Sequence, residues 1–396
     1  MVESIGAVKR HARIDVADVL RGVAVMGIVL LHNIEHFNFY SFPDTTGQSE
    51  WLTFFDKGIW NGLFFMFGGK AYAIFALLFG FSFFIQDDNS RMRGNDFRSR
   101  FCWRLFLLFI IGNINAMFFT AEVLVLYSLV GFILVLTCRM KTRNLIALAV
   151  VFMLQPVALY NIVRALIDPE FVMATLPTSS FWSATFAVQS TGGFMDTLLV
   201  NLWEGQLASL AWAWDNGRVF QTAALFIIGM LIGRNGWFLR DKLRYWGVAG
   251  CIAAACFFPL SGINDMLPRY ISNSSILVPL QLIVKSNANL SFMVMIVSAV
   301  IFMYYCTSSK KVLSKLIPYG KMSMTNYVTQ SIIGSFLYYN WGLGLYRYLG
   351  ITASVMVGAL VFLLQLSACK WWLKRFKHGP FEGAWKKLTW IKLGAA

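Results

Sequence analysis

The chain has 396 residues, of which 58% are hydrophobic and only 13% are charged, and its formal net charge is +15. A soluble domain is usually about 25% charged, so this composition excludes an ordinary soluble protein and predicts an all-α integral membrane protein. The positive charge gathers in short loops between apolar runs, as the positive-inside rule expects of cytoplasmic loops. We therefore expect membrane lipids, and no nucleic acid, as partners of these cations. The six cysteines show no CxxC spacing, so no metal site is predicted.

Ten apolar runs are long enough to cross a bilayer, whose hydrocarbon core is roughly 30 Å thick. In chain order they are Val19–Tyr40, Ile59–Ile85, Phe101–Phe119, Val123–Cys138, Leu145–Leu166, Phe220–Gly233, Tyr245–Leu260, Leu290–Cys306, Met322–Tyr338 and Ile351–Leu373. Basic residues fill every second connection between these runs, which places both termini in the cytoplasm. The sequence therefore predicts a single membrane domain, residues 1–396, with ten transmembrane helices.

Two outer segments are predicted to lie on the membrane rather than cross it. The connection from Asp168 to Asn216 is rich in tryptophan and contains no basic residue. Tryptophan collects at membrane interfaces, so we expect amphipathic interfacial helices in this long outer loop. A second such segment is expected at Ser275–Lys285.

The first predicted span carries ionisable side chains along its length. Asp18 and Arg21, three residues apart, can pair near the inner surface. His32 lies about 16 Å beyond Arg21, at ~1.5 Å per residue. An imidazole at that depth is either packed against a neighbouring helix or functional, and ionisable groups inside a bilayer favour function. Glu35 and His36 share the helix face of His32.

Polar residues also interrupt the next three spans. Lys70 follows two glycines in the second hydrophobic run. It either pairs with an acid, for which Glu122 is the nearest candidate, or points into a polar cavity. Asn115 lies near the end of the third span and Glu122 stands directly before the fourth, and both are candidates for lining the same cavity.

Two further polar groups share helix faces. Arg100 and Arg104, four residues apart, enter the membrane on one face of the third span. They form either an ordinary cytoplasmic anchor or an anion site, because the arginine fork suits phosphates. In the ninth span, Ser323, Asn326 and Gln330 form a polar stripe that either makes interhelical hydrogen bonds or lines a cavity.

Five phrases of the sequence carry a family resemblance: RIDVADVLRGVAVMGIVLLHN, KAYAIFALLFGFSFF, FIIGMLIGR, GKMSMTNYVTQS and WWLKRFKHGPFEGAWKKLTW. Together they resemble the YeiB-like family of multi-pass bacterial membrane proteins (domain of unknown function 418). The resemblance runs over nearly the whole chain. It implies a multi-pass protein of the bacterial inner membrane, and it implies no reaction.

The opening phrase is also similar to a wider group. This group contains the membrane acyltransferases that modify cell-surface sugars and the lysosomal enzyme that acetylates glucosamine from acetyl-CoA. In the acyltransferases a histidine follows an arginine by eleven residues, as His32 follows Arg21 here. The resemblance implies His32 as catalytic base or acyl acceptor, Arg21 as its supporting residue, and the arginines before the third span as partners of coenzyme A phosphates.

The favoured hypothesis is an acyltransferase that moves an acyl group from cytoplasmic acyl-CoA to an envelope glycan or lipid. Its predicted catalytic residues are His32 as base, with Glu35 or Asp18 to orient it. Its predicted substrate-binding residues are Arg21, Lys70, Arg100, Arg104, Asn115, Glu122, Asn326 and Gln330. The alternative is a transporter or flippase in which His32, Lys70 and Glu122 form a gated polar path. A third hypothesis is a noncatalytic scaffold.

Overall fold

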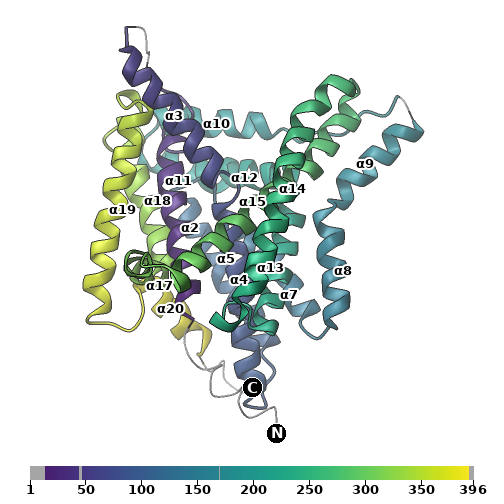
Figure 1. Ribbon diagram of the computed structural model, residues 1–396. Helices are drawn as coiled ribbons and strands as arrows, with labels where there is room; N and C mark the ends of the chain where they lie inside the picture. Colours follow the sequence, from purple (N-terminus) through teal and green to yellow (C-terminus); the bar gives the residue numbers. More distant parts are fainter. Residues whose placement is uncertain (1–13, 44–46, 169, 392–396) are drawn as a thin grey trace, which may run out of the picture.

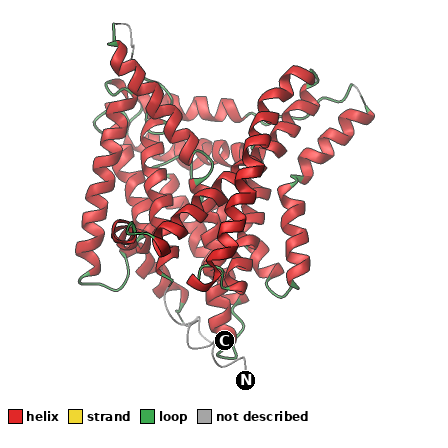
Figure 2. Ribbon diagram, in the orientation of Figure 1, coloured by secondary structure: helices red, strands yellow, loops and turns green. Residues whose placement is uncertain are grey.

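Helices account for all the regular secondary structure of the described residues, 14–43, 47–168 and 170–391, in this computed structural model (Figure 2). The first ten are α2 (Asp15–Ile34), α3 (Glu50–Phe67), α4 (Ala71–Arg91), α5 (Arg98–Ala116), α6 (Leu124–Val130), α7 (Phe132–Thr137), α8 (Thr142–Met153), α9 (Pro156–Ile167), α10 (Thr178–Thr191) and α11 (Phe194–Val200). A π-helix, η1 (Asn201–Gly205), then leads to α12 (Gln206–Asp215), α13 (Arg218–Asn235), α14 (Leu243–Tyr270), α15 (Ser274–Cys306), α16 (Lys310–Leu313), α17 (Ile317–Lys321), α18 (Ser323–Tyr338), α19 (Ile351–Leu373) and α20 (Pro380–Thr389).

The apolar helices are those of a membrane protein. Five helices in the described residues are long and apolar enough to cross a membrane, and the number rises to seven if each of two bent pairs forms one span. The predicted all-α membrane class is confirmed at this level. The count of ten stays a prediction, because some predicted spans hold shorter helices, such as the 16 residues of α18. The location of the termini also stays a prediction, since residues 1–13 and 392–396 lie outside the described part of the chain.

α2 is the central helix of the bundle. It packs against α4, α17 and α19, and most of its side chains are buried. Small residues allow the closest crossings, as is usual between membrane helices. A Cβ on Gly320 of α17 would lie 1.8 Å from the carbonyl oxygen of Asp18 in α2. α4 and α13 meet in the same way, since a Cβ on Gly80 or on Gly229 would lie 2.0 or 1.9 Å from a carbonyl oxygen of the facing helix.

The predicted span Leu145–Leu166 is broken in the middle. It forms α8 and α9, which meet at an angle of 54°. Pro156 opens α9, and the residue before a proline is disfavoured in the α conformation. That residue, Gln155, has a φ of +55° and donates its side-chain N–H to the carbonyl oxygen of Gly217 at 3.0 Å. The bend is therefore held in place by the loop that precedes α13.

α14 and α15 form a long helical hairpin with extensive mutual contact. α15 runs for 33 residues without a break. The expected separate interfacial segment, Ser275–Lys285, is therefore wrong: it is the first part of a continuous helix. The polar residues Lys285 and Asn289, which interrupt the apolar pattern, line a cavity instead of ending the helix.

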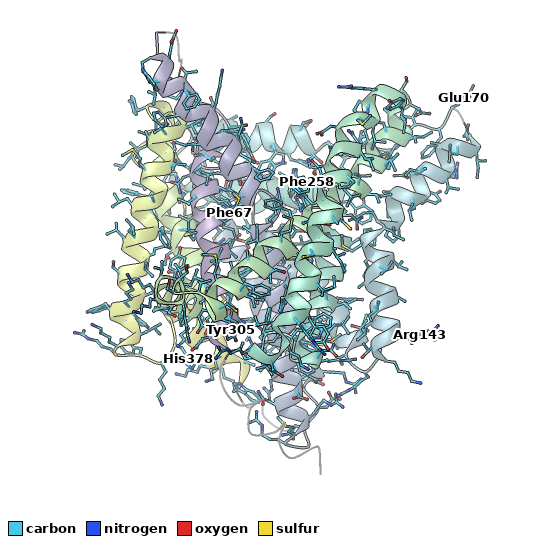
Figure 3. All side chains as sticks on the ribbon, in the orientation of Figure 1. Phe67, Arg143, Glu170, Phe258, Tyr305 and His378 are labelled. Atoms are coloured by element: carbon cyan, nitrogen blue, oxygen red, sulfur yellow. The ribbon has the colours of Figure 1, made fainter. Side chains whose placement is uncertain are left out.

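The bundle has two ends that differ in the elements they carry. α20 lies at one of them, which we call the terminal end, and α10 lies at the opposite, distal end (Figure 1). Arg143 and His378 lie at the terminal end and Glu170 at the distal end (Figure 3). The tryptophan-rich connection forms α10, α11, η1 and α12, so the helices predicted there are present, and their position at a membrane interface stays a prediction.

Candidate functional site

A cavity of about 420 Å³ lies where α2 ends and where α4 and α13 begin. Ligand pockets typically measure ~300–1,000 Å³, so this distal cavity suits a small molecule or a lipid headgroup. It brings together four residues that the sequence singled out: His32, Glu35, Lys70 and Glu122. Its other polar and aromatic lining residues are His36, Tyr40, Phe64, Phe67, Tyr72, Trp182, Ser209, Trp212, Arg218, Lys285, Asn289 and Tyr327.

His32 lies in the last turn of α2 with only 9% of its surface exposed. Its ring stacks on Phe119, with centroids 4.4 Å apart and planes 29° apart. The ring of His36 meets it edge-on at 5.7 Å. The buried Nδ1 of His32 has no hydrogen-bond partner among the described residues. The imidazole is therefore held by aromatic packing, and its Nδ1 is enclosed by protein while the residue as a whole lines the cavity.

Glu35 and His36 follow the last residue of α2, just outside that helix. Oε1 of Glu35 lies 3.5 Å from Nε2 of His36, and the hydroxyl of Tyr40 donates to Oε2 of Glu35 at 3.4 Å. Burial raises the pKa of Glu35 to about 7, and the hydrogen bond from Tyr40 opposes this rise. Glu35 is therefore a carboxyl group that can exchange a proton near neutral pH.

Glu122 lies in the connection between α5 and α6 and is fully engaged by its own surroundings. Its carboxylate accepts hydrogen bonds from the side-chain amide of Asn115 and from the backbone N–H of Leu124. Asn115 and Glu122, both predicted to line one cavity, are thus in contact with each other. Asn115 stands behind Glu122 and does not line the cavity itself.

Lys70 precedes the first residue of α4 and lines the distal cavity. None of the ion pairs found in the described residues includes Lys70, so the suggested pair with Glu122 does not form. The ammonium lies 5.3 Å from the ring centre of Phe292 and 5.9 Å from that of Phe65. Of the two possibilities left open by the sequence, the structure places Lys70 at a cavity.

Two cations of the cavity, Arg218 and Lys285, are missing from the sequence-based site. Arg218 begins α13 and Lys285 lies in the first half of α15. Arg218 and Lys285 both lie on the outer side of the predicted topology, where the loops contain few basic residues. An isolated cation on that side departs from the positive-inside rule, and this departure is the signal that could have identified them.

A second, smaller pocket of about 120 Å³ lies toward the terminal end. Arg21 and Arg104 line it, together with Ser82, Glu382 and Trp385. The predicted pair between Asp18 and Arg21 is confirmed, with an N–O distance of 2.7 Å. Arg21 also donates to the hydroxyl of Ser82 at 2.6 Å.

Asp18 does not contact His32. Their separation of fourteen positions spans about 21 Å along α2, at ~1.5 Å per residue. A hydrogen bond needs a separation near 3 Å, so Asp18 cannot orient the imidazole. Its partner is Arg21, at the other end of the helix.

Arg100 and Arg104 are both occupied by the C-terminal helix α20. Arg100 donates to the carbonyl oxygens of Thr389 and Ile391 at 2.9 and 3.1 Å. The guanidinium of Arg104 lies 3.9 Å from the ring centre of Trp385, and it donates to the hydroxyl of Thr389 at 3.3 Å. Of the two, only Arg104 also faces the terminal pocket.

Asn326 and Gln330 line neither cavity. The side chain of Asn326 donates to the carbonyl oxygen of Tyr319 at 3.0 Å. Gln330 is buried, and its side-chain amide has no partner among the described residues. The polar stripe of α18 therefore makes interhelical contacts at Asn326, and only Ser323 reaches the terminal pocket.

The two cavities approach each other along shared helices. On α4, Tyr72 lines the distal cavity and Phe75 lines the terminal pocket. On α18, Tyr327 lines the distal cavity and Met324 lines the terminal pocket. Three residues of helix rise about 4.5 Å, so the partition is about one helical turn thick. Tyr127 closes it by donating its hydroxyl to the carbonyl oxygen of Tyr72 at 2.8 Å.

The described residues contain no group of three or more His, Cys, Asp or Glu side chains arranged to hold a metal ion. The distal cavity is instead a site of imidazoles, carboxyl groups and cations between aromatic walls. Such a site can accept a proton from a hydroxyl or amine and can hold a negatively charged group.

Comparison with known proteins gives full-length relatives of this chain. It is 25% identical to the uncharacterized protein YxaH of Bacillus subtilis (strain 168), over 96% of this chain and 95% of that protein. It is 24% identical to the uncharacterized protein YeiB of Escherichia coli (strain K12), over 96% of this chain and 97% of that protein. Residues 232–392 match the family described as "Protein of unknown function (DUF418)". The resemblance to the YeiB-like family is thereby confirmed: the chain is similar to YeiB over nearly its whole length, and its C-terminal part is similar to the DUF418 family.

Proposed function

We propose that this protein is a bacterial inner-membrane acyltransferase with ten spans and with its terminal end in the cytoplasm. It transfers an acyl group from cytoplasmic acyl-CoA to a hydroxyl or amine of an envelope glycan or lipid. One observation carries the proposal. The His32 imidazole lines the distal cavity, and a second pocket bearing arginines lies about one helical turn beyond it, on the other side of a thin partition.

The reaction assigns one proton-transfer role to His32. A ring nitrogen takes the proton of the acceptor hydroxyl or amine while the acceptor atom forms a bond to the thioester carbonyl carbon. The carbon–sulfur bond then breaks, and the thiolate of coenzyme A receives the proton from the imidazolium. The products are the acylated acceptor and free coenzyme A, and the imidazole returns to its neutral form.

The remaining residues position the two substrates. Arg21 and Arg104 give positive charge to the terminal pocket, on the side where the phosphates of the donor approach. That pocket measures only about 120 Å³, so it receives part of the thioester arm while the nucleotide stays outside. Glu35 acts beside His32, and Glu122 shapes the acceptor side of the cavity.

The test uses purified full-length protein with labelled acetyl-CoA and a bacterial envelope extract as acceptor. His32→Gln is expected to reduce acyl transfer by roughly 10²–10⁴-fold, the usual contribution of a general base. His378→Gln is the matched control, because this histidine lies at the opposite, terminal end of the molecule. Equal transfer by wild type and by His32→Gln would remove His32 from catalysis.

A transporter or flippase is the second candidate, because the same two cavities on either side of a thin partition also suit alternating access. The two functions differ in what they require of acyl-CoA. Stabilisation of the protein by coenzyme A together with acyl transfer supports the enzyme. Counter-flow of a labelled substrate in proteoliposomes without loss of acyl-CoA supports transport.

A further inference from the structure

We infer that the distal cavity binds the phosphate group of an amphiphilic ligand through three cations, Lys70, Arg218 and Lys285, which we name the cation wall. These residues come from three separate parts of the fold: the turn before α4, the start of α13 and the body of α15. All three line the same cavity. None of them takes part in any ion pair found in the described residues.

Arg218 is held in a fixed orientation. Its guanidinium lies 4.5 Å from the ring centre of Tyr72 and 5.4 Å from that of Trp212. One terminal nitrogen donates to the side-chain oxygen of Gln221 at 2.8 Å, and the buried Nε has no partner in the described part of the chain. A planar guanidinium fixed in this way is prepared to bind two oxygens of one phosphate.

Lys70 needs a negative partner more than the other two cations do. Only 8% of its surface is exposed, and the positive charges of Arg218 and Lys285 both act on its ammonium. Like charges gathered in a partly enclosed cavity repel one another strongly, because the surroundings screen them less than water does. A phosphate monoester carries roughly −1.5 to −2 at pH 7 and would compensate most of this charge.

The acidic side chains of the cavity do not supply that compensation. Glu35 is engaged by Tyr40 and His36, and Glu122 is engaged by Asn115 and by the backbone of α6. The cavity lining thus contains both the cation wall and a group of imidazoles and carboxyls. A ligand with a phosphate at one point and a hydroxyl or amine at another matches both.

The apolar part of the lining indicates that the ligand also has a hydrocarbon portion. Beside its polar groups, the cavity is lined by Ile28, Leu31, Phe64, Phe67 and Leu126. Burial of hydrocarbon against such surfaces is favourable by about 25 cal/mol per Å². A lipid phosphate therefore satisfies the whole lining, whereas a free phosphate satisfies only the cation wall. The identification of this ligand as the acyl acceptor rests on the proposed function, but its binding does not.

The experiment measures binding by the purified full-length protein in a neutral detergent, without acyl-CoA. The probes are phosphatidic acid, diacylglycerol with the same chains, and inorganic phosphate. Native mass spectrometry counts bound lipid, and tryptophan fluorescence follows thermal stability. The variants are Arg218→Gln and Lys285→Gln, with Arg269→Gln as the matched control, since Arg269 is an exposed cation outside the cavity.

Phosphatidic acid is expected to bind at least tenfold more tightly than diacylglycerol, and Arg218→Gln is expected to weaken it about tenfold, as loss of a charge-assisted contact does. Arg269→Gln should change the affinity less than twofold. Binding of phosphatidic acid alone identifies a lipid source, and equal protection by inorganic phosphate identifies a soluble one. If Arg218→Gln does not fold, Lys285→Gln takes its place, because this side chain is exposed.

Equal affinity for phosphatidic acid and diacylglycerol would overturn the inference, as would unchanged binding in both cation-wall variants. Neither result bears on acyl transfer, because no donor is present. Conversely, loss of transfer activity in the His32 experiment leaves the binding result intact. Failure of the cation wall and failure of the proposed function can therefore be told apart.

Discussion

Glu382 of α20 caps the first turn of α18 through Thr325, although 57 residues separate the two in sequence. The backbone N–H of Thr325 donates to Oε1 at 3.0 Å and its hydroxyl donates to Oε2 at 2.5 Å. The N–H of Met324 donates to Oε1 at 2.8 Å. The first N–H groups of a helix have no partner within that helix. A side chain from the C-terminal helix supplies the missing acceptor here.

Glu382→Ala is expected to lower stability by about 1–2 kcal/mol, because it leaves two N–H groups of α18 without an acceptor. The midpoint of thermal unfolding in detergent measures the change. Glu382→Gln keeps one acceptor oxygen and should lose about half as much. Exposed Glu50→Ala serves as the control and should leave the midpoint nearly unchanged. A Glu382→Ala protein as stable as wild type would show that this cap is not needed.

Trp385→Ala is expected to loosen α20. The mutation removes the surface on which the Arg104 guanidinium lies at 3.9 Å and the indole N–H that donates to the carbonyl oxygen of Arg104 at 3.2 Å. Hydrogen exchange should become roughly 10-fold faster in α20, as the loss of about 1.4 kcal/mol of local stability requires. Trp371→Ala removes an exposed cation–π contact with Arg375 and should leave α20 unchanged. Equal hydrogen-exchange rates of α20 in Trp385→Ala and Trp371→Ala would contradict a stabilising role of Trp385.

Gly69→Ala is expected to destabilise the turn before α4 for two reasons. The φ of Gly69 is +73°, and a Cβ there would lie 3.0 Å from a terminal nitrogen of Arg218. Gly94→Ala is the matched control, because Gly94 has a φ of +76° and a Cβ added to it would meet no atom within 4 Å. Left-handed backbone costs about 1–2 kcal/mol in either variant. Only Gly69→Ala should in addition weaken anion binding, and an equal effect of both on binding would rule out the contact with Arg218.

The raised pKa of Glu35 predicts a pH-dependent stability with a definite sign. Burial raises the pKa to about 7 from an ordinary value of 4.5, so between these two pH values the folded protein binds more protons at this site than the unfolded chain. Stability from this group therefore falls as the pH rises from about 4.5 to about 7. Glu35→Gln should remove this dependence and gain about 1–3 kcal/mol relative to wild type above pH 7.

The measurement for Glu35 is the unfolding midpoint of both proteins at pH 5 and pH 8. The other titratable groups at this cavity are common to the two proteins, so the difference between their unfolding midpoints reports Glu35. These groups are His32, His36, Tyr40, Lys70, Tyr72, Glu122, Arg218, Lys285 and Tyr327. If the unfolding midpoint changes equally in both proteins between pH 5 and pH 8, Glu35 does not carry the raised pKa.

The sequence predicted those parts of the site that depend on local spacing. Asp18 and Arg21 pair because residues three apart on a helix are neighbours. His32 and Lys70 reach one cavity because ionisable groups in apolar spans turn away from lipid, and Glu122, directly before the fourth predicted span, lines the same cavity. Apolar runs in the sequence likewise located the helices, because a helix surrounded by lipid must be long and apolar.

The remaining parts depend on which segments meet in space. Arg100 and Arg104 share a helix face as predicted, but their partners on α20 lie 281 or more residues away in sequence. Spacing along α5 cannot reveal such partners. Arg218 and Lys285 were missed for the same reason, because each looks like an isolated charge until α13 and α15 meet the turn before α4. Likewise, the bend at Gln155 depends on its contact with the carbonyl oxygen of Gly217.

The uninterrupted length of α15 also sets the depth of the distal cavity. From Lys285 to Cys306 the helix rises about 32 Å, at ~1.5 Å per residue. This rise equals the roughly 30 Å width of the oily layer of a bilayer. When Cys306 stands at one face of that layer in an upright helix, the ammonium of Lys285 stands at the other. α15 thus sets the distance between Tyr305, at the terminal end (Figure 3), and Lys285, which lines the distal cavity.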